Sequence, residues 1–360
     1  MIYRPFGAFR TLLALLVVAQ HVGPLGPAGM DWTVWATGST AVLAFFALSG
    51  FVITEAAERF YQARPGAFAV NRGIRIVPQY LLALALSVAS VALVARYRPG
   101  FLPNELVTGS PTQMFAPGNL ATNLIAILPG TQDGHMFVPY AWALRAEIAF
   151  YVLLAGTIWL ASHMRSAAYP TLACAGAAIF AAFLAGKGPG LFQFAPFFAY
   201  GIAAYFATAR RSLGLYAVVA GLFGVCLWTA LRISIPSAFA WRAYSAAESV
   251  THAALFSALL LAPLVLSRVE LPDHWRRVDR RIGDLSYPVY LQQIAVLVLF
   301  SAFLPHAYWA VAAAFVAALA LGFLSDRVLE RALRKLRDRV RGRRLEAPAP
   351  AGRAWRRPPI

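Results

Sequence analysis

Residues 10–21 read RTLLALLVVAQH, in which one arginine and one histidine enclose an almost wholly apolar run. A run of this kind, close to membrane length, predicts a transmembrane helix. On a helix, the eleven steps from Arg10 to His21 bring both side chains to nearly the same face, roughly 16 Å apart along the axis. The span is expected to end just beyond His21, at Gly23, Pro24, Gly26 and Pro27.

His21 and Arg10 each have two interpretations. An ionisable side chain at membrane depth is costly unless a partner, a water-filled cavity or a chemical role offsets the loss of water. His21 is therefore either a functional residue or a side chain that hydrogen-bonds a neighbouring helix near the membrane boundary. Arg10 is either part of the same site or a cytoplasmic anchor.

The composition defines a polytopic membrane protein. Of the 360 residues, 60% are hydrophobic and only 13% are charged, with a mean hydropathy of +0.62, which excludes a soluble domain of this length. Cys174 and Cys226 lie in apolar runs with no His or Cys close by, so neither a disulfide framework nor a metal site is indicated. Apolar runs of spanning or near-spanning length are centred near residues 16, 47, 85, 152, 177, 200, 223, 258, 295 and 316. They predict an all-α bundle of about ten transmembrane helices.

The basic residues predict the orientation. An even number of spans puts both termini on one side of the membrane, and the connections on that side hold most of the 32 Lys and Arg residues. By the positive-inside rule, both termini are expected to be cytoplasmic. The net charge of +17 then indicates topology and attraction to membrane lipid, not nucleic-acid binding. We expect a transmembrane domain over residues 1–330 and a basic cytoplasmic tail over 331–360, amphipathic at first and then disordered.

Two further stretches carry polar residues. Ser49 and Gly50 lie near the middle of the second span, where small residues commonly allow close helix packing. Arg72 and Arg75 are three residues apart at the entry to the third span, so they share one helix face. These two arginines can bind phosphate groups or lie among lipid headgroups.

A carboxylate in the fourth span needs a partner. Glu147 lies about five residues below Trp142, an aromatic of the kind that marks the membrane interface, and Tyr151 follows one turn later. Since the first span runs outward and the fourth runs inward, Glu147 and His21 could meet. A Glu that accepts a hydrogen bond from His fixes its tautomer, which is the arrangement of a general base and its orienting group.

These residues lie in motifs that resemble membrane acyltransferase family 3. The matching stretches are the Arg10 and His21 spacing, FFALSGF (45–51), RGIRIVPQY (72–80), WALRAEIAFY (142–151), LSYPVYL (285–291) and Glu330. The resemblance implies a bundle of about ten helices in the bacterial inner membrane. It also implies transfer of an acyl group, usually from cytoplasmic acetyl-CoA, to a sugar of a cell-surface or exported glycan.

The resemblance also assigns roles. His21 and Glu147 match the residues thought essential, with His21 as general base, and the arginines, including Arg10, match groups implicated in holding CoA. The matching motifs carry further candidates that would support the site: Ser49, Trp142, Tyr151, Tyr290 and Glu330. No permanently bound cofactor is expected.

The chain departs from the family pattern in ways that affect the acceptor more than the reaction type. Ala143 and Arg145 stand where family members commonly have Ser, Thr or Asn, and Gln293 stands where they commonly have His. The alternative function is a secondary transporter or flippase, with His21 and Glu147 as a proton relay. Transporters usually show matching halves, and no internal repeat is evident here.

Overall fold

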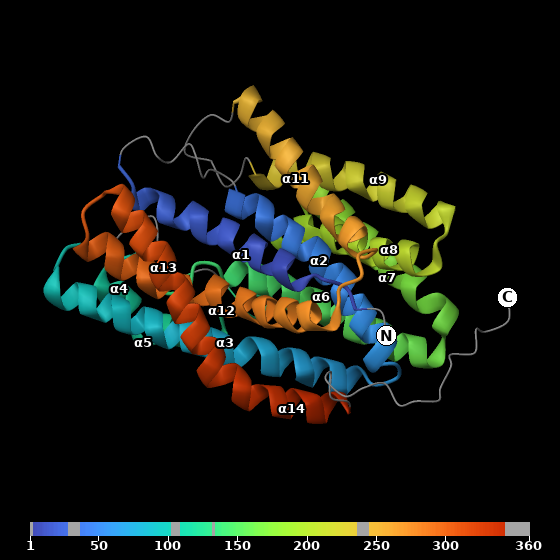
Figure 1. Cartoon of the computed structure of the whole chain (residues 1–360), viewed down its shortest axis with the longest axis horizontal. Coiled ribbons are helices and arrows are strands. Elements are labelled where there is room, and N and C mark those ends of the chain that lie inside the picture. The colour runs from blue at the N-terminus through green and yellow to red at the C-terminus, as the bar shows by residue number, and fades with distance from the viewer. Residues whose placement is uncertain (1–2, 28–36, 102–108, 132–133, 236–244, 343–360) are drawn as a thin grey trace.

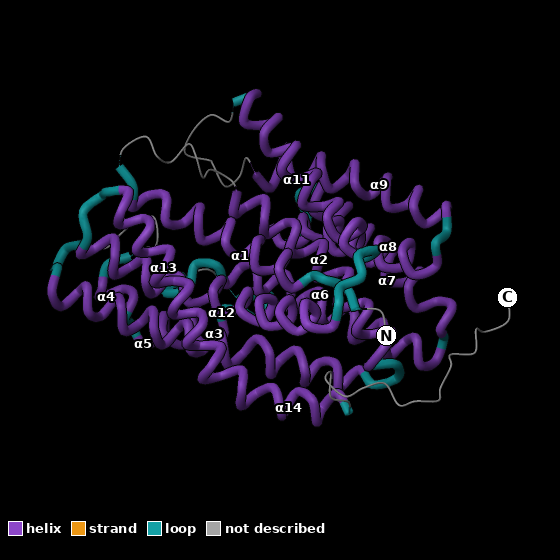
Figure 2. The backbone as a smooth tube through the Cα atoms, viewed as in Figure 1, coloured by secondary structure: helices purple, strands orange, loops and turns teal. Residues whose placement is uncertain are grey.

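A computed structural model describes residues 3–27, 37–101, 109–131, 134–235 and 245–342. Within these ranges the chain is helical and contains no strand (Figure 2). Ten helical segments are long and apolar enough to cross a membrane, and each lies over one of the predicted apolar runs. The prediction of an all-α bundle with about ten spans is therefore confirmed, and the chain is an integral membrane protein.

Figure 1 shows the described helices, coloured in chain order. The first half contains α1 (Gly7–Val22), η1 (Gly23–Leu25), α2 (Thr37–Phe60), α3 (Pro65–Tyr97), α4 (Pro111–Met114), α5 (Pro117–Ile125) and α6 (Ala141–His163). The middle contains α7 (Arg165–Leu184), η3 (Gly190–Phe194), α8 (Ala195–Arg210), α9 (Leu213–Thr229) and the π-helical η4 (Ala230–Ser234). The last part contains α11 (Ala246–Leu266), α12 (Asp273–Phe303), α13 (Tyr308–Ser325), the π-helical η5 (Asp326–Glu330) and α14 (Arg331–Arg341).

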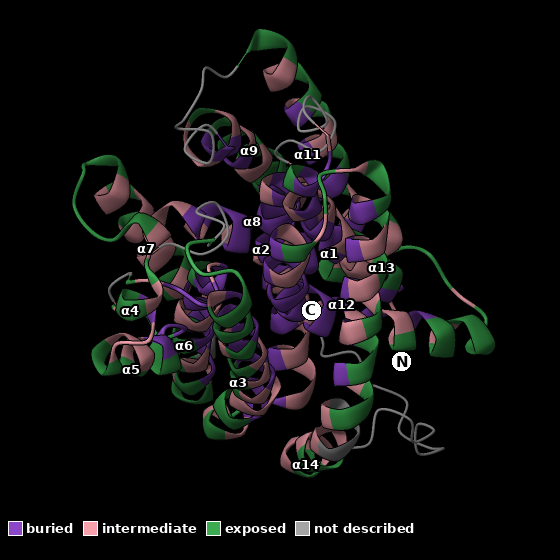
Figure 3. Cartoon of the chain, turned by 90° about the vertical axis from the view of Figure 1, so that its left-hand side faces the viewer, coloured by how far each residue is buried: buried purple, intermediate pink, exposed green. Residues whose placement is uncertain are grey.

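Burial separates a central group of helices from a peripheral one (Figure 3). In α2 and α12, 72% of the most apolar stretch is buried, against 11% in α7. The side chains of α7 and α9 therefore face the surroundings along most of their length, as expected for helices that contact lipid. The centre of the bundle is formed by α1 with α12 and α2, and by α2 with α8.

Glycines allow the central helices to approach closely. A Cβ atom on Gly201 of α8 would lie 1.9 Å from the Ala47 carbonyl oxygen of α2, and one on Gly283 of α12 would lie 2.5 Å from the Gly7 Cα of α1. Helices in lipid gain little from the hydrophobic effect, so packing of small residues is a main source of association. Gly50 packs against α8 in this way, because its own Cβ would lie 2.3 Å from the Phe198 carbonyl oxygen.

Asp279 sets the register between α1 and α12. Its carboxylate accepts hydrogen bonds from the Gly7 and Ala8 backbone N–H groups, both at 2.8 Å, and so satisfies free donors at the start of α1. The Tyr3 hydroxyl donates to the same carboxylate at 2.5 Å, and burial together with Asp279 raises the pKa of this hydroxyl, which keeps it a donor. The helices run parallel from this point, which brings the last turn of α1 beside Gln293 of α12.

Contacts between charged and polar side chains bring together the start of α1, the end of α2, the start of α3 and α14. Arg4 and Arg59 both pair with Glu55, at 3.5 and 2.9 Å, and Asn71 at the start of α3 donates to the Arg337 carbonyl oxygen of α14 at 3.0 Å. We call this end of the bundle the basic end. The last turn of α1, with His21, lies at the opposite end.

At the opposite end, the short helices α4 and α5 fill the long connection between α3 and α6 (Figure 1). As the sequence indicates, α5 is too short to span a membrane. Its buried Asn123 accepts from the Phe137 N–H at 2.9 Å, and its carbonyl oxygen accepts from the Tyr80 hydroxyl of α3. Arg145 of α6 is also buried and donates to the Ala126 carbonyl oxygen at 2.5 Å, so it anchors this connection.

Candidate active site

A cleft opens between α1, α2, α3, α6 and α12. Seven of the residues singled out in the sequence line it, although they come from five separate helices. They are Arg10, Ser49, Arg72, Arg75, Glu147, Tyr151 and Tyr290. The remaining wall is largely apolar, with Val42, Phe45, Phe46, Leu48, Val52, Ile53, Ile76, Ala143 and Leu144.

The arginines gather at the part of the cleft nearer the basic end. Arg72 is only 9% exposed, and its guanidinium lies 5.6 Å from the Phe68 ring centre and 5.9 Å from that of Tyr151. The Arg75 guanidinium lies 5.9 Å from the ring centre of Tyr287. Aromatic faces attract cations and help to hold such groups in place. Of the two interpretations given above, this geometry favours arginines that face a ligand cleft over arginines that lie among lipid headgroups.

Glu147 lies in the cleft and is held by hydroxyl groups. One of its carboxylate oxygens accepts from the Ser49 hydroxyl at 3.2 Å and from the Tyr151 hydroxyl. Ser49 therefore faces the cleft while its neighbour Gly50 packs against α8, so this part of α2 serves both packing and the site.

The expected contact between Glu147 and His21 is not found among the described residues, and the reason is depth. Tyr140, directly before α6, packs against the His21 ring with 4.4 Å between ring centres. Glu147 is seven residues further along, about 10 Å deeper on the helix axis. The two ionisable groups therefore occupy different levels of the bundle, and Glu147 does not orient His21 in this structure.

The side chain beside the His21 ring is that of Gln293, in the position expected for Glu147. The His21 Nδ1 atom lies 3.4 Å from the Gln293 Oε1 atom. The Gln293 Nε2 atom donates to the Tyr290 carbonyl oxygen at 2.9 Å, which is an acceptor only, so this bond fixes the orientation of the fully buried amide. With Oε1 toward the ring, this contact favours the tautomer of His21 that carries its proton on Nδ1, and the Val17 backbone is a further hydrogen-bond partner of the ring. In that tautomer the Nε2 atom carries the lone pair.

In the sequence, Gln293 stands out only as a departure from the family pattern. A signal for its role was present, because Ser286, Tyr290 and Gln293 follow helical spacing and share one face of α12. What was missing is the register between α1 and α12, which Asp279 sets through backbone contacts.

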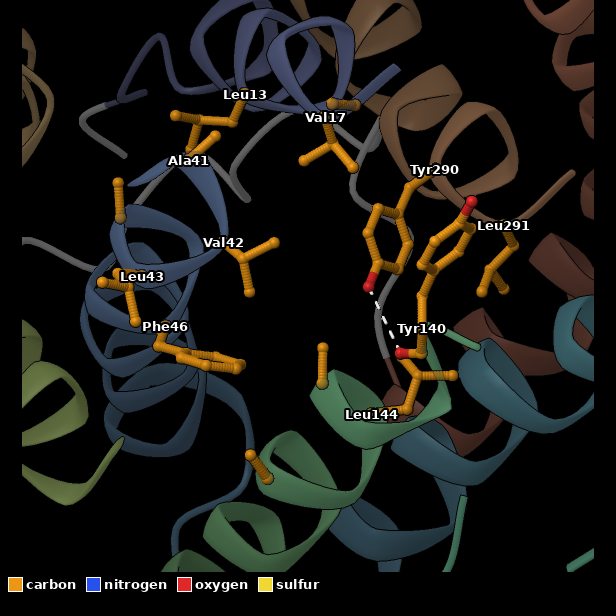
Figure 4. Close-up of a cluster of buried hydrophobic side chains, with 14 of the residues drawn as sticks. Leu13, Val17, Ala41, Val42, Leu43, Phe46, Tyr140, Leu144, Tyr290 and Leu291 are labelled. Atoms are coloured by element: carbon orange, nitrogen blue, oxygen red, sulfur yellow. Dashed lines mark hydrogen bonds between the residues drawn. The ribbon is translucent and has the colours of Figure 1, made fainter. Parts of the chain in front are cut away.

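Two tyrosines separate His21 from the cleft. Tyr290 lines the cleft, whereas His21 is not among the lining residues. The Tyr290 hydroxyl donates to the Tyr140 carbonyl oxygen at 3.3 Å, and the two rings lie 6.0 Å apart (Figure 4). Tyr140 in turn contacts His21, so the cleft ends one aromatic layer away from the imidazole.

The two remaining predicted residues lie elsewhere. Trp142 is 39% exposed and stacks on Phe194 of η3, with ring centres 5.3 Å apart, as suits an aromatic at a membrane interface. Glu330 ends η5, and its side chain lies outside the described residues.

The fold and the cleft together define a polytopic membrane protein with an arginine-lined, largely apolar cleft inside its helix bundle. A family model described as "Acyltransferase domain" matches residues 6–327, and the chain therefore belongs to this family, the acyltransferase family 3 that its motifs resemble. No curated protein and no solved structure matches the chain. The protein is thus a membrane acyltransferase, and the cleft is its candidate active site.

Proposed function

We propose that this protein is an O-acyltransferase that moves an acyl group, in the simplest case acetyl, from cytoplasmic acyl-CoA to a hydroxyl of an exported or lipid-linked saccharide. The observation that carries the proposal is the cleft itself, which has Arg10, Arg72 and Arg75 in its walls and extends between apolar side chains to Tyr290. Guanidinium groups bind phosphates through charge-assisted, bidentate hydrogen bonds. The apolar walls suit the uncharged arm and acyl group of the donor.

The distribution of basic residues supports this direction of transfer. The basic end holds most of the charged connections, and the positive-inside rule assigns it to the cytoplasm. The membrane in this proposal is the inner membrane of a bacterium. Acyl-CoA is then available at the end of the cleft where the arginines lie. His21 lies toward the opposite face, on the side where an exported saccharide would be.

In the proposed reaction, the His21 Nε2 atom accepts the proton of the saccharide hydroxyl. The hydroxyl oxygen attacks the thioester carbonyl carbon, the C–S bond breaks, and an ester forms. CoA leaves as the thiolate and takes up the proton from His21. General-base catalysis of this kind contributes about a hundredfold to ten-thousandfold to the rate. For the two substrates to meet, the Tyr140 and Tyr290 layer between His21 and the cleft must open during turnover.

Glu147 has a different role in this scheme. Its contacts with Ser49 and Tyr151 fix three side chains along the donor path. We assign it to holding the shape and charge of the cleft beside Arg72 and Arg75. Loss of its charge is then expected to affect the donor and not the tautomer of His21.

Purified protein in nanodiscs with acetyl-labelled acetyl-CoA tests the proposal. The expected result is release of free CoA thiol together with label bound covalently to an added membrane saccharide fraction, and neither should be seen with His21→Ala. A protein that binds no acyl-CoA and instead carries a saccharide across the membrane in vesicles would show that the transporter interpretation is the better one.

A further inference from the structure

Helix α14 lies outside the residues that the family model matches, 6–327, yet it is attached to the basic end of the bundle. Asn71 of α3 donates to the Arg337 carbonyl oxygen at 3.0 Å. Arg64, just before α3, donates to the Val340 and Arg341 carbonyl oxygens at 3.0 and 3.2 Å, and so caps the last turn of α14. Figure 1 shows α14 along the edge of the bundle beside α3.

The helix turns a stripe of arginines toward the bundle. Arg334, Arg337 and Arg341 follow i, i+3, i+7 spacing and share one face. Arg334 pairs with Asp284 of α12 at 3.7 Å, and the Arg341 guanidinium lies 5.6 Å from the Phe60 ring centre of α2. Arg337 stands between them.

Other residues of α14 point away from the bundle. Lys335 and Arg339 are exposed, and the apolar Leu336 is 44% exposed. An amphipathic helix that only covered the bundle would turn its apolar residues inward. Leu333 and Val340 are partly buried beside the stripe, so apolar packing accounts for part of the attachment of α14. The arginines that share this side still need an explanation.

Helical register places this stripe next to the arginine-lined part of the cleft, although none of the three arginines is among the lining residues. We call this end of the cleft its entrance. Asn71 and Arg75 are four residues apart and share a face of α3, while Asp284 and Tyr287 are three apart and share a face of α12. Arg75 and Tyr287 contact each other inside the cleft. The stripe thus lies between α3 and α12, about one helical turn nearer the basic end than Arg75 and Tyr287. It extends the arginine-lined wall in that direction.

We infer that Arg334 and Arg337 form a second anion site at this entrance, which binds the outermost phosphate of a nucleotide-bearing acyl donor. The inference rests on the proposed function. In CoA the thioester is at one end, a diphosphate lies in the middle, and a 3′-phosphate is on the ribose at the other end. If the thioester points toward His21, the diphosphate reaches Arg72 and Arg75, and the 3′-phosphate is left at α14. Between residues 326 and 341 basic residues outnumber acidic ones, which favours an anion there.

The test compares CoA with 3′-dephospho-CoA, which lacks only that phosphate. Calorimetry on the full-length protein in nanodiscs of zwitterionic lipid should show about tenfold tighter binding of CoA in the parent, as one charged hydrogen-bonded contact provides. Arg334→Gln and Arg337→Gln should reduce this ratio to near one and leave 3′-dephospho-CoA binding unchanged. Arg339→Gln and Lys335→Gln remove the same charge from the exposed face of α14 and should keep the ratio.

A fifth variant distinguishes loss of the site from misfolding. Asp284→Asn removes the carboxylate that pairs with Arg334, so it should increase the preference for CoA, which an unfolded helix cannot do. If the parent binds both nucleotides equally, the inference is wrong while the proposed donor survives. If the parent binds neither, the proposed function itself fails.

Lipid phosphate is the other possible source of the same chemistry. The measurements are therefore repeated with anionic phosphatidylglycerol in the nanodiscs. A ratio that stays near ten supports the nucleotide site. In the other outcome, Arg337→Gln changes the affinity for 3′-dephospho-CoA in anionic nanodiscs but not in zwitterionic ones. That result would assign the stripe to lipid headgroups and overturn the inference.

Discussion

The Nδ1 atom of His21 lies 3.4 Å from the Oε1 atom of Gln293, an acceptor that favours the imidazole tautomer with its proton on Nδ1. The amide is fixed from behind by its bond to the Tyr290 carbonyl oxygen. An uncharged amide orients the ring as a carboxylate would but adds no negative charge. In the proposed reaction, this pair presents the Nε2 lone pair of His21 to the acceptor hydroxyl.

The first prediction concerns Gln293. Gln293→Leu keeps the volume of the side chain but removes the hydrogen bond, so the Nδ1–H tautomer should lose its preference. We expect kcat to fall by up to about a hundredfold, the cost of misplacing a catalytic group by about 1 Å, with KM for acyl-CoA little changed. ¹⁵N-histidine NMR in nanodiscs reports the tautomer directly, with His21→Asn used to assign the signal. A Gln293→Leu protein with an unchanged His21 spectrum and full turnover would remove Gln293 from the site.

The second prediction concerns packing between α2 and α8. Gly201→Ala places a Cβ atom 1.9 Å from the Ala47 carbonyl oxygen, so the helices must separate. We expect a loss of about 1–3 kcal/mol, typical of overpacking, measured as a lower melting temperature in detergent. Gly221→Ala on α9 is the matched control, since nothing lies within 4 Å of its added Cβ atom. Equal stability of the two variants would show that α2 and α8 do not approach as closely as described.

The third prediction concerns orientation. The test uses a background in which Cys174 and Cys226 are replaced by alanine. Single cysteines are then introduced at Lys187, in the connection between α7 and η3, and at Arg211, directly after α8, and both positions are exposed. The positive-inside rule predicts that the cysteine at Lys187 reacts with a membrane-impermeant thiol reagent in intact cells and that the one at Arg211 reacts only after lysis. The reverse pattern would place the arginine-lined cleft away from cytoplasmic acyl-CoA.

The sequence predicted the spans and the members of the cleft because both depend on local patterns. Apolar length locates helices, and helical spacing puts Arg10 on the same face as His21 and pairs Arg72 with Arg75. The partner of His21 depends instead on how far one helix is shifted against another. Here that shift follows from the contact of Asp279 in α12 with the start of α1, and from the start of α6 at Ala141. A single sequence reveals neither. The sequence therefore allowed Glu147 to meet His21, whereas the structure pairs Glu147 with Ser49 and places Gln293, noted only as a departure from the family pattern, beside His21.

The fourth prediction concerns the general base. His21→Ala should lower turnover by about a hundredfold to ten-thousandfold while the melting temperature and CoA affinity stay close to those of the parent, because the imidazole lies outside the cleft. An acyl-transfer assay measures the expected loss of turnover, and calorimetry measures the expected unchanged affinity for CoA. His163→Ala, at the exposed end of α6, is the control. Retained turnover, or a variant that does not fold, would favour a structural role for His21.

The last prediction concerns the donor phosphates. Arg72→Lys and Arg75→Lys keep the charge but replace a planar fork by a single ammonium, which cannot form bidentate contacts with phosphate. CoA binding should weaken in both variants, and the deficit should be easiest to measure at low salt, where phosphate contacts contribute most. Arg277→Lys, on the exposed start of α12, should bind CoA as the parent does. Normal CoA binding by the Arg72 and Arg75 variants, combined with its loss in His21→Ala, would reverse the assignment of the two ends of the cleft. The donor would then bind through other groups, of which Arg10 and the arginines from 276 to 281 are the next to test.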